Sequence, residues 1–195
     1  MTTTVVVLGA ALVVSLWLVV RLARARRREQ RHVAFLERLN EISQVLLTER
    51  NVRGVLRLVA ESTSQLLFSD TAYIALLTPD GSRIVLEAAT GVLAPLVGSV
   101  VPAKGSVAAE VVRTGQRLVL NDVGKDGRGF RSLHEGVTLR STAAQPLMLK
   151  GRCIGALCAD NPRRQHQFDQ LDTDLLRDLA SHTALVIESL RAAPV

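Results

Sequence analysis

The sequence is poor in aromatic residues and in cysteine. Aromatic side chains make up only 3% of the 195 residues, whereas 48% are hydrophobic, so a core has to be filled mainly by aliphatic side chains. This composition is typical of a folded domain and not of a disordered chain. Two cysteines are too few for a small domain held together by disulfides. The low aromatic content also offers little stacking surface for nucleic-acid bases.

The two cysteines, Cys153 and Cys158, lie five residues apart in one apolar run. On a strand this spacing places them on opposite faces, where they can neither form a disulfide nor share a metal ion. We interpret both as small buried hydrophobic residues. A reactive Cys158 that faces a pocket is the alternative. The sequence indicates no metal site.

The excess of positive charge is local. The formal net charge is +6 and the pI is near 10.3. Six arginines and a single glutamate account for most of this charge between residues 21 and 31, and the remainder of the chain is almost neutral. A nucleic-acid-binding domain would spread basic residues over its surface and carry a recognition motif. The sequence therefore predicts no nucleic-acid partner.

The first twenty residues predict a transmembrane helix. Thr2 to Val20 carries no charge, and nineteen helical residues extend about 28 Å, close to the roughly 30 Å of a bilayer core. The basic stretch 21–32 is then a juxtamembrane linker on the cytoplasmic side. The predicted localisation is the inner (cytoplasmic) membrane, with a single pass and the globular part in the cytoplasm. The predicted membrane-anchor residues are Trp17, Arg21, Arg24, Arg26, Arg27 and Arg28.

Helical patterns bracket the rest of the chain. Residues 33–50 predict an amphipathic connecting helix, and Asn51 is placed to cap a second helix. Asp169 is placed to cap a last helix that runs to about Arg191. The connecting helix and the last helix each carry an apolar seam that can meet a second copy, so we expect a homodimer. The seam residues are Leu36, Leu39, Leu46, Leu176, Leu179, Val186 and Leu190.

Four apolar runs predict two β-hairpins. The runs at 71–77 and 83–89 are separated by a Pro-Asp-Gly turn, and those at 142–149 and 153–159 by Lys-Gly. The second hairpin is apolar on both faces, which indicates central strands covered on both sides. Pro146 has no N–H to donate, so we expect it at a bulge or at an unpaired position.

The segment between the hairpins is punctuated by glycine and proline. Residues 90–105 predict a loop, residues 106–113 a short helix that ends at Gly115, and residues 118–120 a short strand. Residues 124–136 contain four glycines and predict a surface loop.

Several motifs stand in an order that is similar to a known family. They are Tyr73 to Gly91, Gly105-Ser106-Val107 with Thr114-Gly115, Asn121-Asp122, Arg140 to Gly151, Ile154 to Leu157, and Asn161 with Phe168. Together with the order of elements, they resemble a GAF domain. The resemblance implies an α+β fold with a central antiparallel sheet of about six strands, the N- and C-terminal helices on one face and a pocket on the other. It places the domain at residues 51–191, after the transmembrane helix and before a tail at 192–195.

The specialised branches of this family are matched only in part. Asn161, Phe168 and Asp172 match the signature of cyclic-nucleotide-binding members, but Pro162 and Thr173 stand where that signature has Lys and Glu. The resemblance therefore does not predict cyclic-nucleotide binding.

Two further branches lack their key residues or have them in an ambiguous place. Residues 103–108 lack the cysteine of the free methionine sulfoxide reductases. His134 lies near the loop from which haem-binding members ligate iron, but a histidine in a surface loop is usually solvated. No catalytic residue is predicted, we expect the chain not to be an enzyme, and no cofactor is identified.

The resemblance implies a membrane-anchored cytoplasmic sensory or regulatory module that binds a small ligand or a protein partner and pairs through its terminal helices. We expect a separate output protein, such as a kinase or a regulator. One alternative is a ligand-free interaction scaffold whose pocket is filled by its own side chains, and a less favoured one is a reductase-like enzyme. The ligand-binding residues that the resemblance implies are Thr90, Asn121, Phe130, Thr142, Ala144, Ala156 and Cys158.

Overall fold

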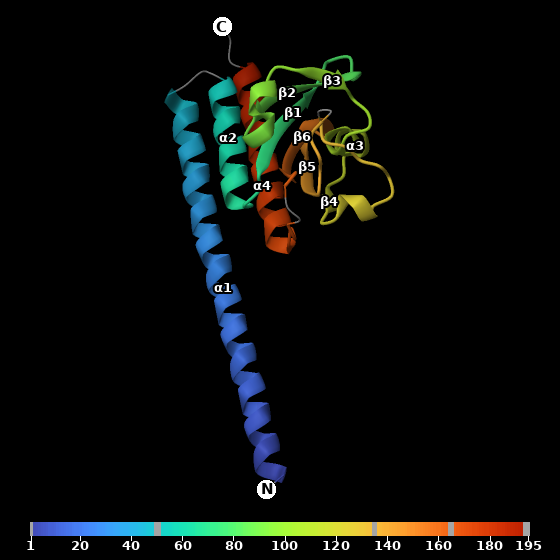
Figure 1. Cartoon of the computed structure of the whole chain (residues 1–195). Helices are drawn as coiled ribbons and strands as arrows, with labels where there is room; N and C mark the ends of the chain where they lie inside the picture. Colours follow the sequence, from blue (N-terminus) through green and yellow to red (C-terminus); the bar gives the residue numbers. More distant parts are fainter. Residues whose placement is uncertain (1, 49–51, 134–135, 164–165, 193–195) are drawn as a thin grey trace. The chain divides into compact units, whose positions relative to one another are not determined.

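A computed structural model describes residues 2–48, 52–133, 136–163 and 166–192 (Figure 1). The chain divides into two units, Met1–Glu37 and Arg38–Val195. The second unit is built on a six-stranded antiparallel sheet in the order β3-β2-β1-β6-β5-β4. The predicted α+β fold is confirmed. The elements are α1 (Thr2–Thr48), α2 (Val52–Leu66), β1 (Thr71–Leu77), β2 (Arg83–Ala89), η1 (Gly91–Leu96), β3 (Val100–Pro102), α3 (Val107–Thr114), β4 (Leu118–Leu120), η2 (Val123–Lys125), β5 (Ser141–Leu149), β6 (Arg152–Asn161) and α4 (Gln170–Ala192).

Helix α1 is continuous where the sequence predicted three segments. It joins the segments predicted at 1–20, 21–32 and 33–50 into one helix that ends at Thr48. The reason lies in the composition, because neither glycine nor proline occurs between Gly9 and the end of the helix. Arginine and glutamate favour helix, so the predicted juxtamembrane linker is itself helical.

The structure does not support the predicted transmembrane span. No helix among the described residues is long and apolar enough to cross a membrane. The Arg21 guanidinium stacks on the Trp17 ring at 5.0 Å.

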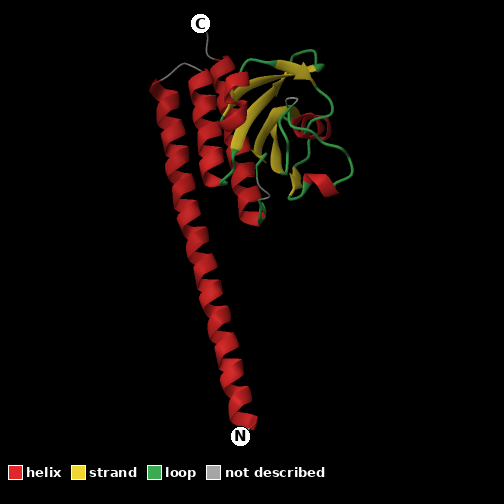
Figure 2. Ribbon diagram, in the orientation of Figure 1, coloured by secondary structure: helices red, strands yellow, loops and turns green. Residues whose placement is uncertain are grey.

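Helices α2 and α4 pack on one face of the sheet, and α3 lies on the other (Figure 2). This arrangement buries the seam that was predicted on α4 for contact with a second copy. Leu176, Leu179 and Val186 are at most 6% exposed, because α4 packs on β5 and α2. The large apolar side chain that α4 exposes is Leu185, and the one exposed from the predicted seam of α1 is Leu36. Outside the described side chains lie Leu39, Leu46 and Leu190.

The predicted caps Gly115 of α3 and Asp169 of α4 are confirmed, and the structure adds Ser106 as the N-terminal cap of α3. Ser106 Oγ accepts a hydrogen bond of 3.1 Å from the backbone N–H three residues on, and Gly115 ends α3 in the left-handed conformation. At α4 the backbone N–H groups of Asp169 and Asp172 each donate to the carboxylate of the other at 2.9 Å. This is a reciprocal capping box. The predicted cap of α2, Asn51, lies outside the described residues.

Both predicted hairpins form, and Pro146 lies beside an irregularity. Pro146 is paired with Ala156 of β6, and the register shifts between the next two residues, Leu147 and Met148. The predicted bulge therefore lies one residue beyond the proline, and Pro146 itself stays in register with its partner. One prediction is wrong, because residues 90–105 are not wholly loop: they contain η1 and β3, which pairs with β2. A three-residue strand is too short to show an alternating pattern in the sequence.

Candidate functional site

The sheet face that carries α3 holds a buried polar cluster. The register places Asp160 of β6 between Thr71 of β1 and Thr142 of β5. Asp160 is 2% exposed, and its Oδ1 accepts a hydrogen bond of 2.6 Å from Thr142 Oγ1. Among the described residues, neither Asp160 Oδ2 nor the hydroxyls of Thr71 and Tyr73 have a hydrogen-bond partner in good geometry, but the Tyr73 phenol lies near enough to Asp160 to lower the pKa of that carboxyl. Because Tyr73 lies two residues after Thr71, its side chain is on the same face.

Burial dominates the electrostatics of this cluster. Desolvation raises the pKa of Asp160 to about 7, against the opposing effect of the Thr142 hydrogen bond. Desolvation and then the nearby Asp160 charge raise the pKa of Tyr73 well above its usual value, and the same two causes raise the pKa of Cys158. The phenol and the thiol are therefore neutral near pH 7, so Cys158 is not an activated nucleophile.

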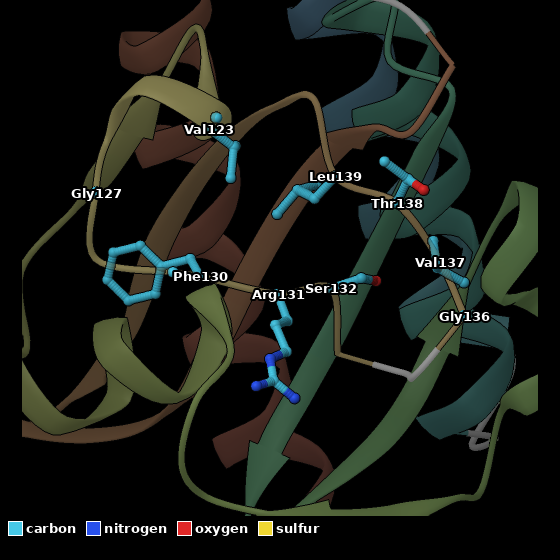
Figure 3. Close-up of a pocket in the computed structure, with 11 residues that line it drawn as sticks. Val123, Gly127, Phe130, Arg131, Ser132, Gly136, Val137, Thr138 and Leu139 are labelled. Atoms are coloured by element: carbon cyan, nitrogen blue, oxygen red, sulfur yellow. The ribbon is translucent and has the colours of Figure 1, made fainter.

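A hollow of about 470 Å³ opens within the segment that joins β4 to β5 (Figure 3). This volume falls in the range of small-molecule sites, roughly 300–1,000 Å³. Phe130, Val137 and Leu139 line the hollow and also pack against the apolar core that contains Tyr73 and Cys158. The hollow therefore lies over the sheet face that carries the buried polar cluster.

Backbone hydrogen bonds anchor this segment at three places. At its beginning, Val123 N donates to Arg140 O at 2.9 Å, and at its end Arg140 N donates to Asn161 O at 3.1 Å. In its middle, Arg131 N donates to Gly105 O at 3.3 Å, and a parallel bridge links it to the residue that caps α3. The predicted surface loop is thus held against α3 over its middle part.

The charged side chains of the segment differ in their partners. The Arg128 guanidinium donates hydrogen bonds to both oxygens of the Asp126 carboxylate, one of them of 2.7 Å. It also stacks on Phe130, with its central carbon 4.7 Å from the centre of the ring. The Arg128 hydrogen bond holds the pKa of Asp126 below its usual value. In the described part of the chain, the Arg131 guanidinium has no ion pair, and the hydroxyl of Ser132, which is 5% exposed, has no hydrogen-bond partner.

Four of the residues predicted to bind a ligand lie on the neighbouring strands β5 and β6 of this face. Ala144, Ala156 and Cys158 are fully buried members of the apolar core. Thr142 is fully buried as well, and its hydroxyl is engaged with Asp160. All four therefore line the sheet face beneath the segment, and the hollow itself is bounded by other residues.

Of the remaining three residues predicted to bind a ligand, one lines the hollow and two do not. Phe130 lines the hollow. Thr90 lies at the start of η1, where its hydroxyl accepts a hydrogen bond from Ala72 N at 2.8 Å. Asn121 accepts a hydrogen bond from Phe168 N at 2.8 Å and donates one to Phe168 O at 3.4 Å, which ties the end of β4 to the residues before α4. Thr90 and Asn121 thus hold the backbone and do not line the hollow.

The sequence did not single out Asp160, Tyr73, Arg131 or Ser132. An aspartate after an apolar run reads as the end of a strand, and its burial becomes evident only when Thr71 is paired with it. Arg131 and Ser132 lie in a glycine-rich stretch without periodicity, so no pattern marks which side chains turn inward.

The family of the chain follows from its sequence and fold together. The sequence model of the GAF domain matches residues 49–188. The chain belongs to the GAF domain family. Members of this family are sensory and regulatory modules that bind small ligands. No curated protein matches the sequence.

Solved GAF structures share the fold at low sequence identity. The GAF domain of an Acinetobacter phosphoenolpyruvate-protein phosphotransferase is 20% identical over 82% of this chain and 96% of its own, with a TM-score of 0.71. A free methionine-R-sulfoxide reductase from Neisseria meningitidis, solved with its substrate, is 26% identical over 82% of this chain and 92% of its own, with a TM-score of 0.67. The GAF-B domain of DevS from Mycobacterium smegmatis is 17% identical over 73% and 96%, with a TM-score of 0.59.

The residues that match the cyclic-nucleotide signature of other GAF domains have structural partners here. Asn161 is buried, accepts a hydrogen bond from Asp70 N at 2.9 Å and donates to Ser141 Oγ at 3.3 Å. Asp172 belongs to the capping box of α4, and Thr173, which stands where the signature has Glu, accepts a hydrogen bond from Gln145 Nε2 at its carbonyl. These residues therefore fix the joint between the sheet and α4.

Other candidate groups carry little chemistry. Both cysteines are free, and Cys153 is half-buried with its pKa raised by desolvation. No group of three metal-ligating side chains occurs among the residues that the structure describes. His134 lies outside those residues.

Proposed function

We propose that this chain is a sensory or regulatory module whose GAF domain binds a small organic molecule in the hollow of the segment that joins β4 to β5. The main support for this proposal is the hollow. Its volume lies in the range of small-molecule sites, and it lies over a sheet face whose buried polar atoms lack hydrogen-bond partners among the described residues. Each such atom costs free energy unless a water molecule or a ligand satisfies it. A ligand-free scaffold would instead fill this space with its own side chains.

A route from the hollow to α4 runs through one hydrogen-bonded joint. Val123 lines the hollow and follows Asn121 by two residues, and Asn121 is hydrogen-bonded to both backbone groups of Phe168. Phe168 lies directly before the capping box of α4. A ligand that shifts the segment therefore acts on the start of α4, provided that it binds the two arrangements with different affinity.

Native mass spectrometry of the full-length chain, purified from its own host, tests the proposal. We expect a small molecule to be retained, and we expect Val137→Trp, which places a bulky ring in the hollow, to release it. Gln116→Leu, at an exposed position outside the hollow, is the control and keeps the molecule. A protein that retains nothing, and that shows no thermal stabilisation with a metabolite library, contradicts the proposal.

An enzymatic function is the second candidate, and the likeness to the Neisseria reductase favours it. Two features weigh against it: no cysteine lies in the stretch 103–108, and Cys158 is fully buried with a raised pKa. A direct assay with free methionine-R-sulfoxide and a thiol reductant decides between them. Turnover that is lost in Cys158→Ser would establish the enzyme, and turnover at the level of the buffer would discard it.

We also propose, from the sequence alone, that the uncharged stretch Thr2 to Val20 attaches the protein to the cytoplasmic membrane. The basic residues that follow it would then lie at the cytoplasmic headgroups. Cell fractionation followed by an alkaline carbonate wash tests this localisation. A protein that is recovered in the supernatant without detergent would contradict it.

Pairing and output complete the proposal. We propose that two copies pair along α1, where Val33 and Leu36 are 50% and 52% exposed. We further propose that a separate protein, such as a kinase or a regulator, receives the signal. Cross-linking in the native host, followed by identification of the attached proteins, tests this part.

A further inference from the structure

The hollow has an uneven charge distribution. Its described lining consists of glycines, four apolar side chains, two hydroxyl-bearing side chains and one charged residue, Arg131. No described acidic residue lines it. The other arginine of the segment, Arg128, is neutralised by Asp126 and covered by Phe130, and it is not part of the lining. Arg131 is therefore the cationic residue of the described lining, and in Figure 3 its side chain extends away from Thr138 and Leu139.

The backbone around Arg131 is fixed although the side chain is exposed. Its N–H donates to Gly105 O, and the parallel bridge to Ser106 joins it to the start of α3. The guanidinium itself makes no hydrogen bond or ion pair with a described residue. The backbone of Arg131 is thus held in place, whereas its guanidinium is not paired with any described residue.

The next residue provides an independent sign of a missing partner. Ser132 is 5% exposed, and its hydroxyl has no hydrogen-bond partner in the described part of the chain. In Figure 3, Arg131 and Ser132 follow one another along the segment, and Thr138 and Leu139 lie on the stretch that returns past them. A buried hydroxyl without a partner costs free energy, which a ligand oxygen at this place would recover.

We propose that the hollow binds a small organic molecule through a single oxyanion group, a carboxylate or a phosphate. Arg131 pairs with the oxyanion, the Ser132 hydroxyl donates a hydrogen bond to the bound molecule, and the apolar body of the ligand packs on Phe130 and Leu139. A guanidinium presents a planar pair of donors that matches carboxylate and phosphate oxygens. One guanidinium compensates one negative charge, so polyphosphates are poor ligands for this hollow. The inference rests on the proposed function and adds the chemical class of the ligand.

Three aromatic probes of similar size but different head group test the inference on the full-length chain. They are 3-phenylpropionate, phenyl phosphate and the neutral 3-phenyl-1-propanol, and binding is followed by saturation-transfer NMR and by thermal shift. At least one of the two anions is expected to bind about tenfold or more tightly than the alcohol, as the loss of a charge-assisted hydrogen bond implies. The comparison of the two anions shows whether carboxylate or phosphate is preferred.

Matched variants assign the effect to one arginine. Arg131→Gln is expected to reduce the affinity for the preferred anion to that for the alcohol, and Ser132→Ala to reduce it a few-fold. Arg128→Gln, the same change three residues away, is expected to leave the affinity for this anion within about twofold of the wild-type value. Equal losses in Arg131→Gln and Arg128→Gln, or an alcohol that binds as tightly as the anions, would overturn the inference.

The molecule retained in native mass spectrometry separates this inference from the proposed function. A retained anion that Arg131→Gln releases supports both. A retained neutral or cationic molecule leaves the proposed function in place and overturns the inference. If no molecule is retained and no probe of any charge binds, both are wrong.

Discussion

Asp160 is a carboxyl group in a place that disfavours its charge. It is 2% exposed and accepts one described hydrogen bond, from Thr142, whereas a buried carboxylate usually needs several donors. Its neighbours Tyr73 and Cys158 are themselves neutral near pH 7 and add no positive charge. The folded protein consequently holds a proton on Asp160 up to a pH of about 7.

Because the folded protein holds this proton, its free energy of unfolding decreases as the pH rises. The pKa of Asp160 is about 7 in the folded state and near 3.8 in the unfolded state, so between these values the folded state binds more protons. The contribution of Asp160 to the free energy of unfolding is therefore largest below pH 4. It decreases as the pH rises toward 7, and it stays low above that pH. Asp160→Asn should remove this fall and be more stable than the wild type at pH 8, on the order of a few kcal/mol.

Urea unfolding at pH 5 and pH 8 measures this effect, and Asp80→Asn is its control. Asp80 is an exposed carboxylate whose pKa is lowered to about 2 by hydrogen bonds from Ser82 and Thr78. Its stabilisation is present above its unfolded pKa and is lost only as the pH falls, so it contributes no slope between pH 5 and 8. An Asp160→Asn protein that keeps the slope of the wild type would refute the assignment.

Gly155 is required by a close approach between two central strands. A Cβ added there would lie 2.3 Å from Ala75 O and 2.7 Å from Leu76 Cδ2, and the backbone oxygen cannot move without breaking the β1–β6 ladder. We expect Gly155→Ala to lower the free energy of unfolding by about 2–4 kcal/mol. Gly124→Ala, whose nearest contact would be 3.5 Å away, should change it by less than about 0.5 kcal/mol. Equal effects in chemical denaturation would contradict this reading.

At the scale of elements, Asn121 joins β4 to α4. Both hydrogen bonds of its side chain go to Phe168, which precedes the capping box. We expect Asn121→Ala to lower the free energy of unfolding by about 1–3 kcal/mol, because two backbone groups of a half-buried turn lose their partner. The exposed Gln116→Ala should be neutral. An Asn121→Ala protein of unchanged stability that has lost only ligand affinity would restore the ligand-binding role that the sequence predicted.

Elements with strong local signals were predictable from the sequence. Ser106, Gly115 and Asp169 are residue types that cap helices by their own chemistry, and the structure uses each of them as a cap. Pro146 cannot donate to a ladder, so a register shift beside it follows from its covalent structure. Such features depend on a few neighbouring residues and need no tertiary information.

The site depended on pairings that the sequence does not display. Asp160 becomes buried because Thr71, nearly ninety positions away in the chain, is its partner across β1 and β6. Arg131 and Ser132 acquire their positions from a bridge to the start of α3. The seam on α4 shows the converse limit: an apolar stripe predicts burial, but it does not tell whether the stripe is buried within the unit or against a second copy.

At the scale of the whole molecule, surface for a second copy has to come from residues that the protomer leaves exposed. Among the described side chains of α4, the large apolar one that is exposed is Leu185, and the residues one turn away from it are polar: Ser181, His182, Glu188 and Ser189. On α1, Val33, Leu36 and the exposed Asn40 follow one another at spacings of three and four. This spacing is that of a coiled-coil seam, in which a buried asparagine favours one register.

Leu36→Asp is therefore expected to convert a dimer into a monomer, with the free energy of unfolding of the domain unchanged. Light scattering after size exclusion, at protein concentrations up to the high micromolar range, measures the mass. Leu185→Asp should leave the dimer intact, because that side chain lies off the seam. Leu179→Ala removes a side chain that is 1% exposed, so it should lower the free energy of unfolding by about 2–5 kcal/mol and leave the mass of the folded fraction unchanged. A wild-type protein that is monomeric throughout this range, or a dimer that Leu185→Asp disrupts and Leu36→Asp does not, would show that pairing along α1 is wrong.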